Sequence, residues 1–218
     1  MIIAIDGPAG SGKSTVSKKI AKRLGLLYVD TGAMYRALTL KAVRGKLDLK
    51  DKDALVRIAK ETAIELSYDK KGDLVVYLDE KDVSSEIRTP ELTNKVKFIA
   101  GVPGVRTEMV KIQRAIAKEG KGAVLEGRDI GTVVFPDADK KFYLDADFKE
   151  RSRRRYNELA AAGEDVSLAA IEEDVRTRDK NDIEREIGPL KKAKDAVKID
   201  TTYLSIEETV EKILSYVR

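Results

Sequence analysis

The sequence predicts a three-layer α/β fold: a five-stranded parallel sheet with helices on both faces, a small antiparallel insert and a helical lid. Three observations predict it. Short apolar runs alternate with helix-like segments along most of the 218 residues. The stretch 64–78 instead holds two strand-like runs around a glycine-containing turn. A highly charged helical stretch, 149–185, separates the last two core strands.

Composition limits the class of protein. At 218 residues with 42% hydrophobic residues, the chain can form one α/β domain with a full core. The absence of cysteine and histidine excludes disulfides, an imidazole base and histidine metal ligands. No apolar run suits a secretory signal or a membrane span, so we expect a soluble cytoplasmic protein. No long apolar stripe is left without a role, which favours a monomer.

The net charge of +4 allows two interpretations. A basic chain can bind nucleic acid, or it can hold the many charges of phosphate groups in one site. The arginines are clustered locally along the sequence, which favours a phosphate site over a nucleic-acid partner.

The first element is a strand over 2–6, and Val16, Ile20 and Leu24 mark the helix that follows. Between them, Gly7-Pro-Ala-Gly-Ser-Gly-Lys-Ser-Thr15 fits the pattern G-x-x-x-x-G-K-[ST]. Glycines let the backbone approach an anion, and the helix N-terminus adds positive charge. A plain glycine turn is the alternative. The expected residues for a nucleoside triphosphate are Gly7, Pro8, Ala9, Gly10, Ser11, Gly12, Lys13, Ser14 and Thr15.

Within this loop two side chains carry chemistry. Lys13 supplies a mobile charge for the β- and γ-phosphates, and the Ser14 hydroxyl can ligate Mg²⁺. We therefore expect Mg²⁺ to enter with the triphosphate.

The next elements are a strand over 26–30 and a helix over 31–44. A helix over 54–64 precedes the hairpin of 64–68 and 74–78, and 83–87 suggests a short third strand. Thr89 and Pro90 are typical of a helix start. Pro103-Gly104 is expected to end that helix, and another follows over 105–116. This antiparallel element interrupts the strand–helix alternation, so we interpret it as an insert.

The remaining core strands are expected at 123–127, 141–146 and 196–200, before a last amphipathic helix over 206–217. We expect a single domain. Its core comprises about 1–35, 107–148 and 186–218, its insert about 36–106, and its lid with flanking helices about 149–185.

Arginines in the charged stretch share a helix face. Arg151, Arg154 and Arg155 stand at i, i+3 and i+4. Three guanidiniums on one face repel each other unless an anion lies between them. The functional interpretation is a lid that spreads the charge of transferring phosphates. The alternative is a solvated helix on which Glu150 and Glu158 offset part of the charge.

A second cluster follows on the next helical stretch. Arg178, Asp182 and Arg185 stand at i, i+4 and i+7, again on one face. An arginine there could grip a phosphate while Asp182 accepts a ribose hydroxyl. Surface ion pairs are the alternative.

Polar residues also follow the carboxyl ends of core strands, where ligands bind in open α/β sheets. Asp30 ends one strand, and Arg128 and Asp129 follow another. The alternatives are a helix cap for Asp30 and a loop ion pair for Arg128 and Asp129. Arg36 and Arg106 lie beside apolar stripes and could reach an acceptor phosphate and a base.

Taken in order, these motifs resemble the bacterial cytidylate kinase family of P-loop nucleoside monophosphate kinases. The similarity covers essentially the whole chain, and the motifs near 30 and 125 are more specific than the glycine-rich loop. The segments that carry it are Ile5 to Thr15, Asp30 to Arg36, Leu125 to Thr132, the lid arginines, Arg178 to Asp182 and Asp195 to Thr201.

The resemblance implies a P-loop kinase fold and transfer of the ATP γ-phosphoryl to CMP or dCMP, in pyrimidine nucleotide metabolism. It implies that Arg106 and Asp129 read the cytosine and that Asp182 contacts the ribose. The acceptor phosphate would be held by Arg36, Arg128 and Arg185. The residues implied at the transferring phosphates are Lys13, Arg128, Arg151, Arg154 and Arg178. The partners would be small nucleotides, with no nucleic acid and no membrane.

One position departs from the family pattern. Lys97 stands where the family often has a serine that contacts cytosine. A lysine cannot accept a hydrogen bond as serine can, so another group makes that contact or base selectivity is altered.

Three other functions compete with this interpretation. A GTP-operated switch would need N-K-x-D, but Asn94-Lys-Val-Lys97 ends in lysine. A basic RNA-binding protein that uses ATP is a second alternative. A kinase of another small acceptor, such as shikimate, is the third, and it would need no base-reading pair.

Overall fold

The strand β1 (Ile2–Asp6) lies at the centre of a five-stranded sheet with the order β2-β6-β1-β7-β8. It pairs in parallel with β6 (Ala123–Gly127) and with β7 (Lys140–Asp145), and β7 pairs in parallel with β8 (Val197–Asp200). The edge strand beside β6 is β2 (Leu27–Asp30). Residues 3 to 5 of β1 are fully buried, as parallel strands covered on both faces require. The predicted sheet is confirmed.

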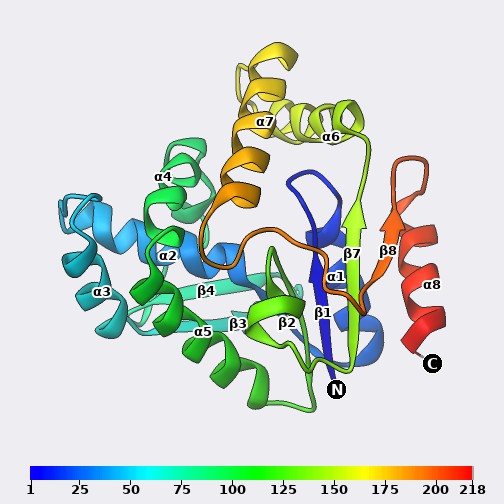
Figure 1. Cartoon of the computed structure of the whole chain (residues 1–218), viewed down its shortest axis with the longest axis horizontal. Helices are drawn as coiled ribbons and strands as arrows, with labels where there is room; N and C mark the ends of the chain where they lie inside the picture. The colour runs from blue at the N-terminus through cyan, green and yellow to red at the C-terminus, as the bar shows by residue number, and fades with distance from the viewer. Residues whose placement is uncertain (218) are drawn as a thin grey trace. The chain divides into compact units, whose positions relative to one another are not determined.

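The computed structural model describes residues 1–217 and divides the chain into two compact units (Figure 1). Unit 1 joins residues 1–28 to the chain from Gly120 onwards, and unit 2 is Val29–Glu119. The division into core, insert and lid that the sequence suggests stays a prediction.

Two helices of unit 1 pair along the sheet. α1 (Lys13–Leu24) and α8 (Ile206–Val217) are joined by ion pairs from Lys19 to Glu207 and from Arg23 to Glu211. The ring of Phe142 on β7 meets Tyr216 of α8 edge-on, with 6.1 Å between centroids. α8 therefore holds β7 and α1 in place around the central strand (Figure 1).

The charged stretch of unit 1 forms two helices, α6 (Phe148–Ala161) and α7 (Leu168–Glu184). The Asp147 side chain caps α6 by accepting from the backbone of Lys149 and Glu150, and Ser167 caps α7. The helical character of this stretch is confirmed, with a break between its helices, and its role as a lid stays a prediction. One element is new: η2 (Ile130–Val134), a π-helical turn after β6.

Unit 2 contains the predicted hairpin, in which β3 pairs antiparallel with β4 and β4 with β5. Its bounds are α2 (Thr31–Arg44), α3 (Lys52–Lys60), β3 (Ile64–Tyr68), β4 (Leu74–Leu78), β5 (Lys81–Asp82), the 3₁₀ turn η1 (Glu86–Arg88), α4 (Pro90–Ala100) and α5 (Pro103–Lys118).

Three boundaries in unit 2 differ from the prediction. The third strand lies at Lys81–Asp82 and not over 83–87, because the Ser84 hydroxyl accepts the amide of Val76 that a longer strand would have bonded. Pro103 begins α5 and does not end α4, since a first helical position needs no N–H. The helix expected over 54–64 starts earlier, at Lys52, and ends at Lys60.

We expect Gly7→Ala to destabilise the fold more than Gly25→Ala. A Cβ on Gly7 would lie 2.1 Å from the backbone oxygen of Leu144, whereas a Cβ on Gly25 would meet nothing within 4 Å. Gly25→Ala should lower the free energy of unfolding by about 1 to 2 kcal/mol, the cost of a left-handed backbone. Gly7→Ala should cost more than about 3 kcal/mol. Urea unfolding measures both, and equal losses would contradict the prediction.

Candidate active site

The glycine-rich loop takes a shape that side chains would block. Gly10 and Gly12 have φ angles of 75° and 85°, and a Cβ on Gly10 would lie 2.6 Å from the backbone oxygen of Arg151. Gly12 precedes α1, and no side chain of the described residues, 1–217, caps this helix start. The first amides of α1 are thus available to an anion, as the sequence pattern predicts.

Lys13 is the buried cation of this loop. Its side chain is almost covered, and Nζ donates to the Pro8 carbonyl at 3.1 Å. Burial, and after it the nearby charge of Arg128, lowers the pKa of Lys13 to about 7. An anion placed against Nζ would favour the charged form, so the environment of Lys13 suits a phosphate.

A carboxylate that the sequence analysis missed lies beside the loop. Glu126 of β6 is 2% exposed and accepts from the hydroxyls of Ser14, at 2.9 Å, and Tyr28. Hydroxyl and carboxylate oxygens are the donors that Mg²⁺ prefers, so Ser14 with Glu126 fits this ion. The rule that singled out Asp30 and Arg128, a polar residue at the carboxyl end of a core strand, would also have found Glu126.

The predicted residues of the β6–η2 loop and of α7 come together in unit 1. Arg128 Nε donates to Asp182 at 2.6 Å, and Arg185 lies 3.6 Å from Asp182 and 3.5 Å from Asp129. Burial acts to lower the pKa of Arg128, but Asp182 raises it overall. Burial acts to raise the pKa of Asp182, and Arg128 lowers it overall. Arg185 stands just beyond the last residue of α7, where it still meets Asp182.

Arg178 adds a further charge to this cluster. Its pKa is lowered by burial and then by the charge of Arg128. The carboxylate of Asp174 lies 3.7 Å away. Because Lys13 is also influenced by Arg128 and Arg178, these three cations share one electrostatic environment. Burial and the charge of Arg128 disfavour the charged forms of Lys13 and Arg178, and such an environment favours the binding of an anion.

Arg151 and Arg154 hold protein groups. Arg151 donates to the Ala9 carbonyl at 3.1 Å and pairs with Asp179 at 2.7 Å. Arg154 donates to the hydroxyl and carbonyl of Thr201 at 3.0 and 2.6 Å. α6 is thus fastened to the phosphate loop, to α7 and to the segment after β8. Arg155 pairs with Glu158, as the solvated-helix alternative expects.

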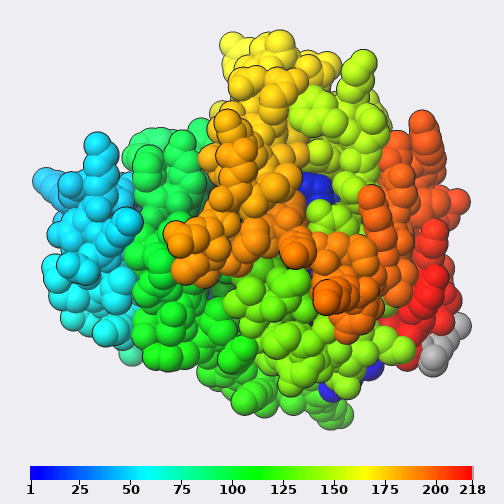
Figure 2. All heavy atoms as spheres, in the orientation of Figure 1, coloured from blue at the N-terminus to red at the C-terminus, as the bar shows by residue number. Residues whose placement is uncertain are grey.

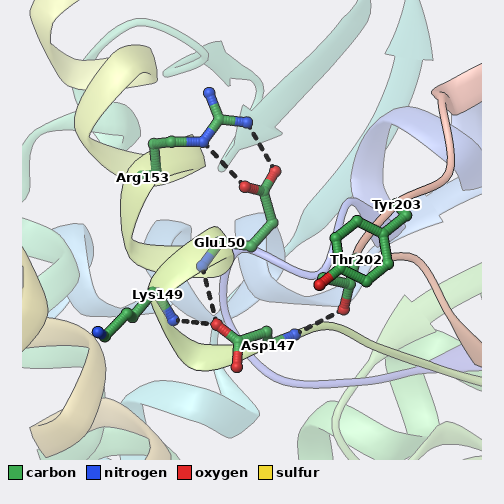
Figure 3. A pocket seen from close by; sticks show the side chains of 6 residues that line it. All are labelled: Asp147, Lys149, Glu150, Arg153, Thr202 and Tyr203. Carbon is green, nitrogen blue, oxygen red and sulfur yellow. Dashed lines mark hydrogen bonds and ion pairs between the residues drawn. The ribbon is translucent and has the colours of Figure 1, made fainter.

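A pocket of about 430 Å³ opens between the start of α6 and the segment after β8 (Figure 3). The Asp147 backbone amide donates to the Thr202 hydroxyl across it. The Tyr203 side chain is 97% exposed, so its ring is available for stacking. The pocket is lined by Asp147, Lys149, Glu150, Arg153, Thr202 and Tyr203.

Within unit 2, Asp30 and Arg36 form one group. The Asp30 carboxylate accepts from the Ala33 amide at 2.8 Å, so it caps α2, and it pairs with Arg36 at 3.2 Å. Arg36 Nε is buried without a hydrogen-bond partner among residues 1–217. The cap alternative for Asp30 therefore holds, while Arg36 keeps one donor for a ligand.

Arg106 and Lys97, both in unit 2, differ in their exposure to solvent. Arg106 is buried, with its guanidinium 5.7 Å from the centre of the Tyr35 ring. Lys97 is exposed and lies over Phe98 at 5.3 Å. The departure at Lys97 thus replaces a small polar side chain with a cation held on a neighbouring ring.

A space-filling view shows the N-terminal segment reaching the surface of unit 1. A small blue area of it is visible between the yellow-green atoms of α6 and the orange atoms of α7 (Figure 2).

No helix within residues 1–217 has the length and apolar character that a bilayer crossing requires.

A central strand that leads into a glycine loop, a buried lysine at the start of the next helix and a cluster of arginines define a P-loop phosphotransferase. Comparison with known proteins narrows this class. The family model described as cytidylate kinase matches residues 3–218. The chain belongs to the cytidylate kinase family and is a nucleoside monophosphate kinase, with ATP as a substrate.

Curated relatives agree over nearly the full length. The cytidylate kinase of Geobacillus sp. is 52% identical over 215 residues, which cover 99% of this chain and 95% of the relative. That of Desulforamulus reducens is 51% identical over 215 residues, 99% and 96% of the two chains. An uncharacterized protein from Eubacterium ventriosum, solved as a crystal structure, shares the fold: its TM-score is 0.51 at 15% identity, covering 100% of this chain and 98% of that one.

We expect ATP binding to be accompanied by proton uptake at Lys13. The pKa of Lys13 is about 7 in the free protein, so at about pH 8 most of its amine is neutral. The triphosphate raises that pKa, and the uptake should approach about one proton per ATP. Calorimetric titration in two buffers of different ionisation enthalpy measures it.

Lys22→Met is the matched control, since Lys22 is an exposed lysine of the same helix and its loss should leave the uptake unchanged. Binding of ATP to the unaltered protein without proton uptake would show that Lys13 does not meet the phosphates.

Proposed function

We propose that the candidate site transfers the γ-phosphoryl of ATP to CMP or dCMP, giving ADP with CDP or dCDP. The observation that carries this assignment is the environment shared by Lys13, Arg128 and Arg178 beside a glycine-rich loop. Arg128 lowers the pKa of both Lys13 and Arg178, and their charged forms are stabilised when two phosphorylated substrates bring negative charge. Membership of the cytidylate kinase family supports the choice of acceptor.

On the donor side, the loop from Gly7 to Thr15 holds the triphosphate through its backbone amides and Lys13. Ser14 and Glu126 hold Mg²⁺, which neutralises phosphate charge when bound. The proposal for Glu126 is supported by its hydrogen bond from the Ser14 hydroxyl.

We assign the pocket beside α6 to the nucleoside end of ATP. Thr201 supports this assignment, because its hydroxyl donates to the Ser11 carbonyl of the phosphate loop at 3.1 Å and the pocket begins at the next residue. The exposed ring of Tyr203 offers a face on which a base can stack. A volume of about 430 Å³ is sufficient for a nucleoside.

On the acceptor side, we propose that Arg36, Arg128 and Arg185 hold the monophosphate. Asp182 contacts the ribose, while Arg106 and Asp129 read the cytosine. Arg36 is supported by its unpartnered Nε. Base reading in this chain rests on Arg106 and Asp129, because Lys97 cannot accept a hydrogen bond.

The chemistry needs positioning and charge neutralisation more than a base. The acceptor phosphate is already anionic and attacks the γ-phosphorus without losing a proton to a histidine. We propose that Arg151, Arg154 and Arg178 spread the charge of the transferring group and that the α6–α7 lid limits access of water.

The wider setting is also proposed. We infer a monomer that acts in the cytoplasm on small nucleotides, without a nucleic-acid or membrane partner. The gathering of buried cations beside the glycine loop supports small phosphorylated partners. We further propose one kinase domain in which a core carries the acceptor insert and the lid.

An acceptor panel tests the function. We expect CMP and dCMP to be phosphorylated at least about tenfold more efficiently than AMP or UMP, the discrimination of one or two hydrogen bonds to the base. ADP release in a coupled assay measures each rate. Equal rates with AMP would reassign the protein among the monophosphate kinases, and phosphorylation of shikimate alone would overturn the assignment.

Lys13→Ala should abolish turnover while the circular dichroism spectrum stays unchanged.

Tyr203→Ala should raise the KM for ATP by about three- to tenfold, the loss of one stacked ring. The KM for CMP should change little, because the substitution lies in the donor pocket. Steady-state kinetics with each substrate varied measures both. Tyr216→Ala is a control that removes a tyrosine that is 44% exposed and meets Phe142 away from the pocket. A larger effect on CMP than on ATP would remove the nucleoside of ATP from this pocket.

A further inference from the structure

We propose that Asp6 is a positioning residue for the acceptor side of the reaction, fixing the loop that carries Arg128 and Asp129 relative to the phosphate-binding loop. This inference rests on the proposed function, because Arg128 and Asp129 are the residues assigned there to the acceptor. Asp6 itself touches neither substrate in this proposal.

Asp6 stands at the junction of the two loops. It is the last residue of β1, directly before Gly7, and it is paired in register with Gly127 at the end of β6. Its side chain is 3% exposed. Oδ1 accepts from the amide of Ile130 at 2.7 Å and Oδ2 from the amide of Gly131 at 2.8 Å. One carboxylate thus holds two successive peptides of the opposite loop.

Those two peptides follow Asp129 directly. They open the π-helical turn η2, where the first amides have no partner within the turn. Gly131 leaves little room for adjustment, since a Cβ there would lie 3.3 Å from Lys141 and 3.4 Å from Asp6. With both amides bound, the direction of the chain at Arg128 and Asp129 is set by Asp6.

A role in stability alone does not account for a carboxylate here. Burial raises the pKa of Asp6 to about 6, so its ionised form is disfavoured in the folded protein. Only the ionised carboxylate offers an acceptor oxygen to each amide. A neutral Asn or a protonated Asp would place a donor against one of them. The site therefore retains an unfavourable charge that orders the loop.

Among residues 1–217, the charged and titratable groups near Asp6 come from the β6–η2 loop and from β7. Asp129 raises its pKa and Arg128 lowers it, both from the β6–η2 loop. On β7, Tyr143 is within electrostatic range of Asp6, and Lys141 packs against Gly131. The acceptor for the amides of Ile130 and Gly131 is the Asp6 carboxylate and not one of these neighbouring groups.

The test compares Asp6→Asn with Asp139→Asn. Asp139 also accepts a backbone amide of β1, that of Ile2 at 2.6 Å, but at the opposite end of the strand. We expect Asp6→Asn to raise the KM for CMP about tenfold, as the loss of one hydrogen bond to a charged group does, and the KM for ATP less than about twofold. Asp139→Asn should change neither.

A pH profile separates positioning from stability. The ratio of kcat/KM for CMP between the unaltered protein and Asp6→Asn cancels the titration of CMP itself. We expect this ratio to fall from about ten near pH 8 towards one near pH 5, where Asp6 is protonated and resembles Asn. A ratio independent of pH, or equal increases in both KM values, would overturn the proposal.

If Asp6→Asn does not fold, the unaltered protein answers the question. The amide proton resonances of Ile130 and Gly131 should shift together with pH, with a midpoint near pH 6. The affinity for CMP, after correction for the titration of the CMP phosphate, should change with the same midpoint. Amide shifts that do not change with pH would overturn the inference. Absence of CMP phosphorylation by the unaltered protein would instead contradict the proposed function, so the two failures are distinguishable.

Discussion

The burial of the Lys13 ammonium among other cations is the constraint on which the rest of the site depends. Lys13 lies at the start of α1, directly after the loop that follows the buried strand β1, and the charge of Arg128 acts on it there. The fold thus keeps these charges close together, although they repel each other and would be more favourably hydrated if they were apart. Burial of apolar surface supplies the free energy that maintains the arrangement, and an anion relieves it.

Carboxylates balance this charge without cancelling it. Asp182 engages Arg128 directly, and Glu126 takes the hydroxyl of Ser14. Each carboxylate also fixes the direction in which its partner points, so the Arg128 guanidinium and the Ser14 hydroxyl are oriented before a substrate arrives. Such preorganisation reduces the rearrangement that transfer between two anions would otherwise require. The same acid–base pairs therefore serve the stability of unit 1 and the chemistry proposed for it.

Features that depend on residues close together in the sequence could be predicted from it. The strands, the glycine loop and the helix start at Thr89 and Pro90 follow from local preferences, and the family motifs identified the arginines. The strand-end rule also marks Glu126 and Asp6, but their contacts with Ser14 and Ile130 could not be predicted because these partners are distant in sequence and meet them only after folding. Asp179 was missed for the same reason, since its partner is Arg151 on another helix. The third strand was misplaced because a single hydroxyl, that of Ser84, takes the amide that would have extended it.

The close packing of Gly10 on the backbone of Arg151 limits where the proposed lid could bend. The first turn of α6 rests on the phosphate loop, and Arg151 is bound there to Ala9 and Asp179. This turn is therefore anchored to the loop, and any movement of the proposed lid would begin in the part of α6 beyond it. Such a movement would leave the contacts between Gly10, Ala9 and Arg151 in place, so the loop proposed to hold the triphosphate would keep its shape while the lid moved.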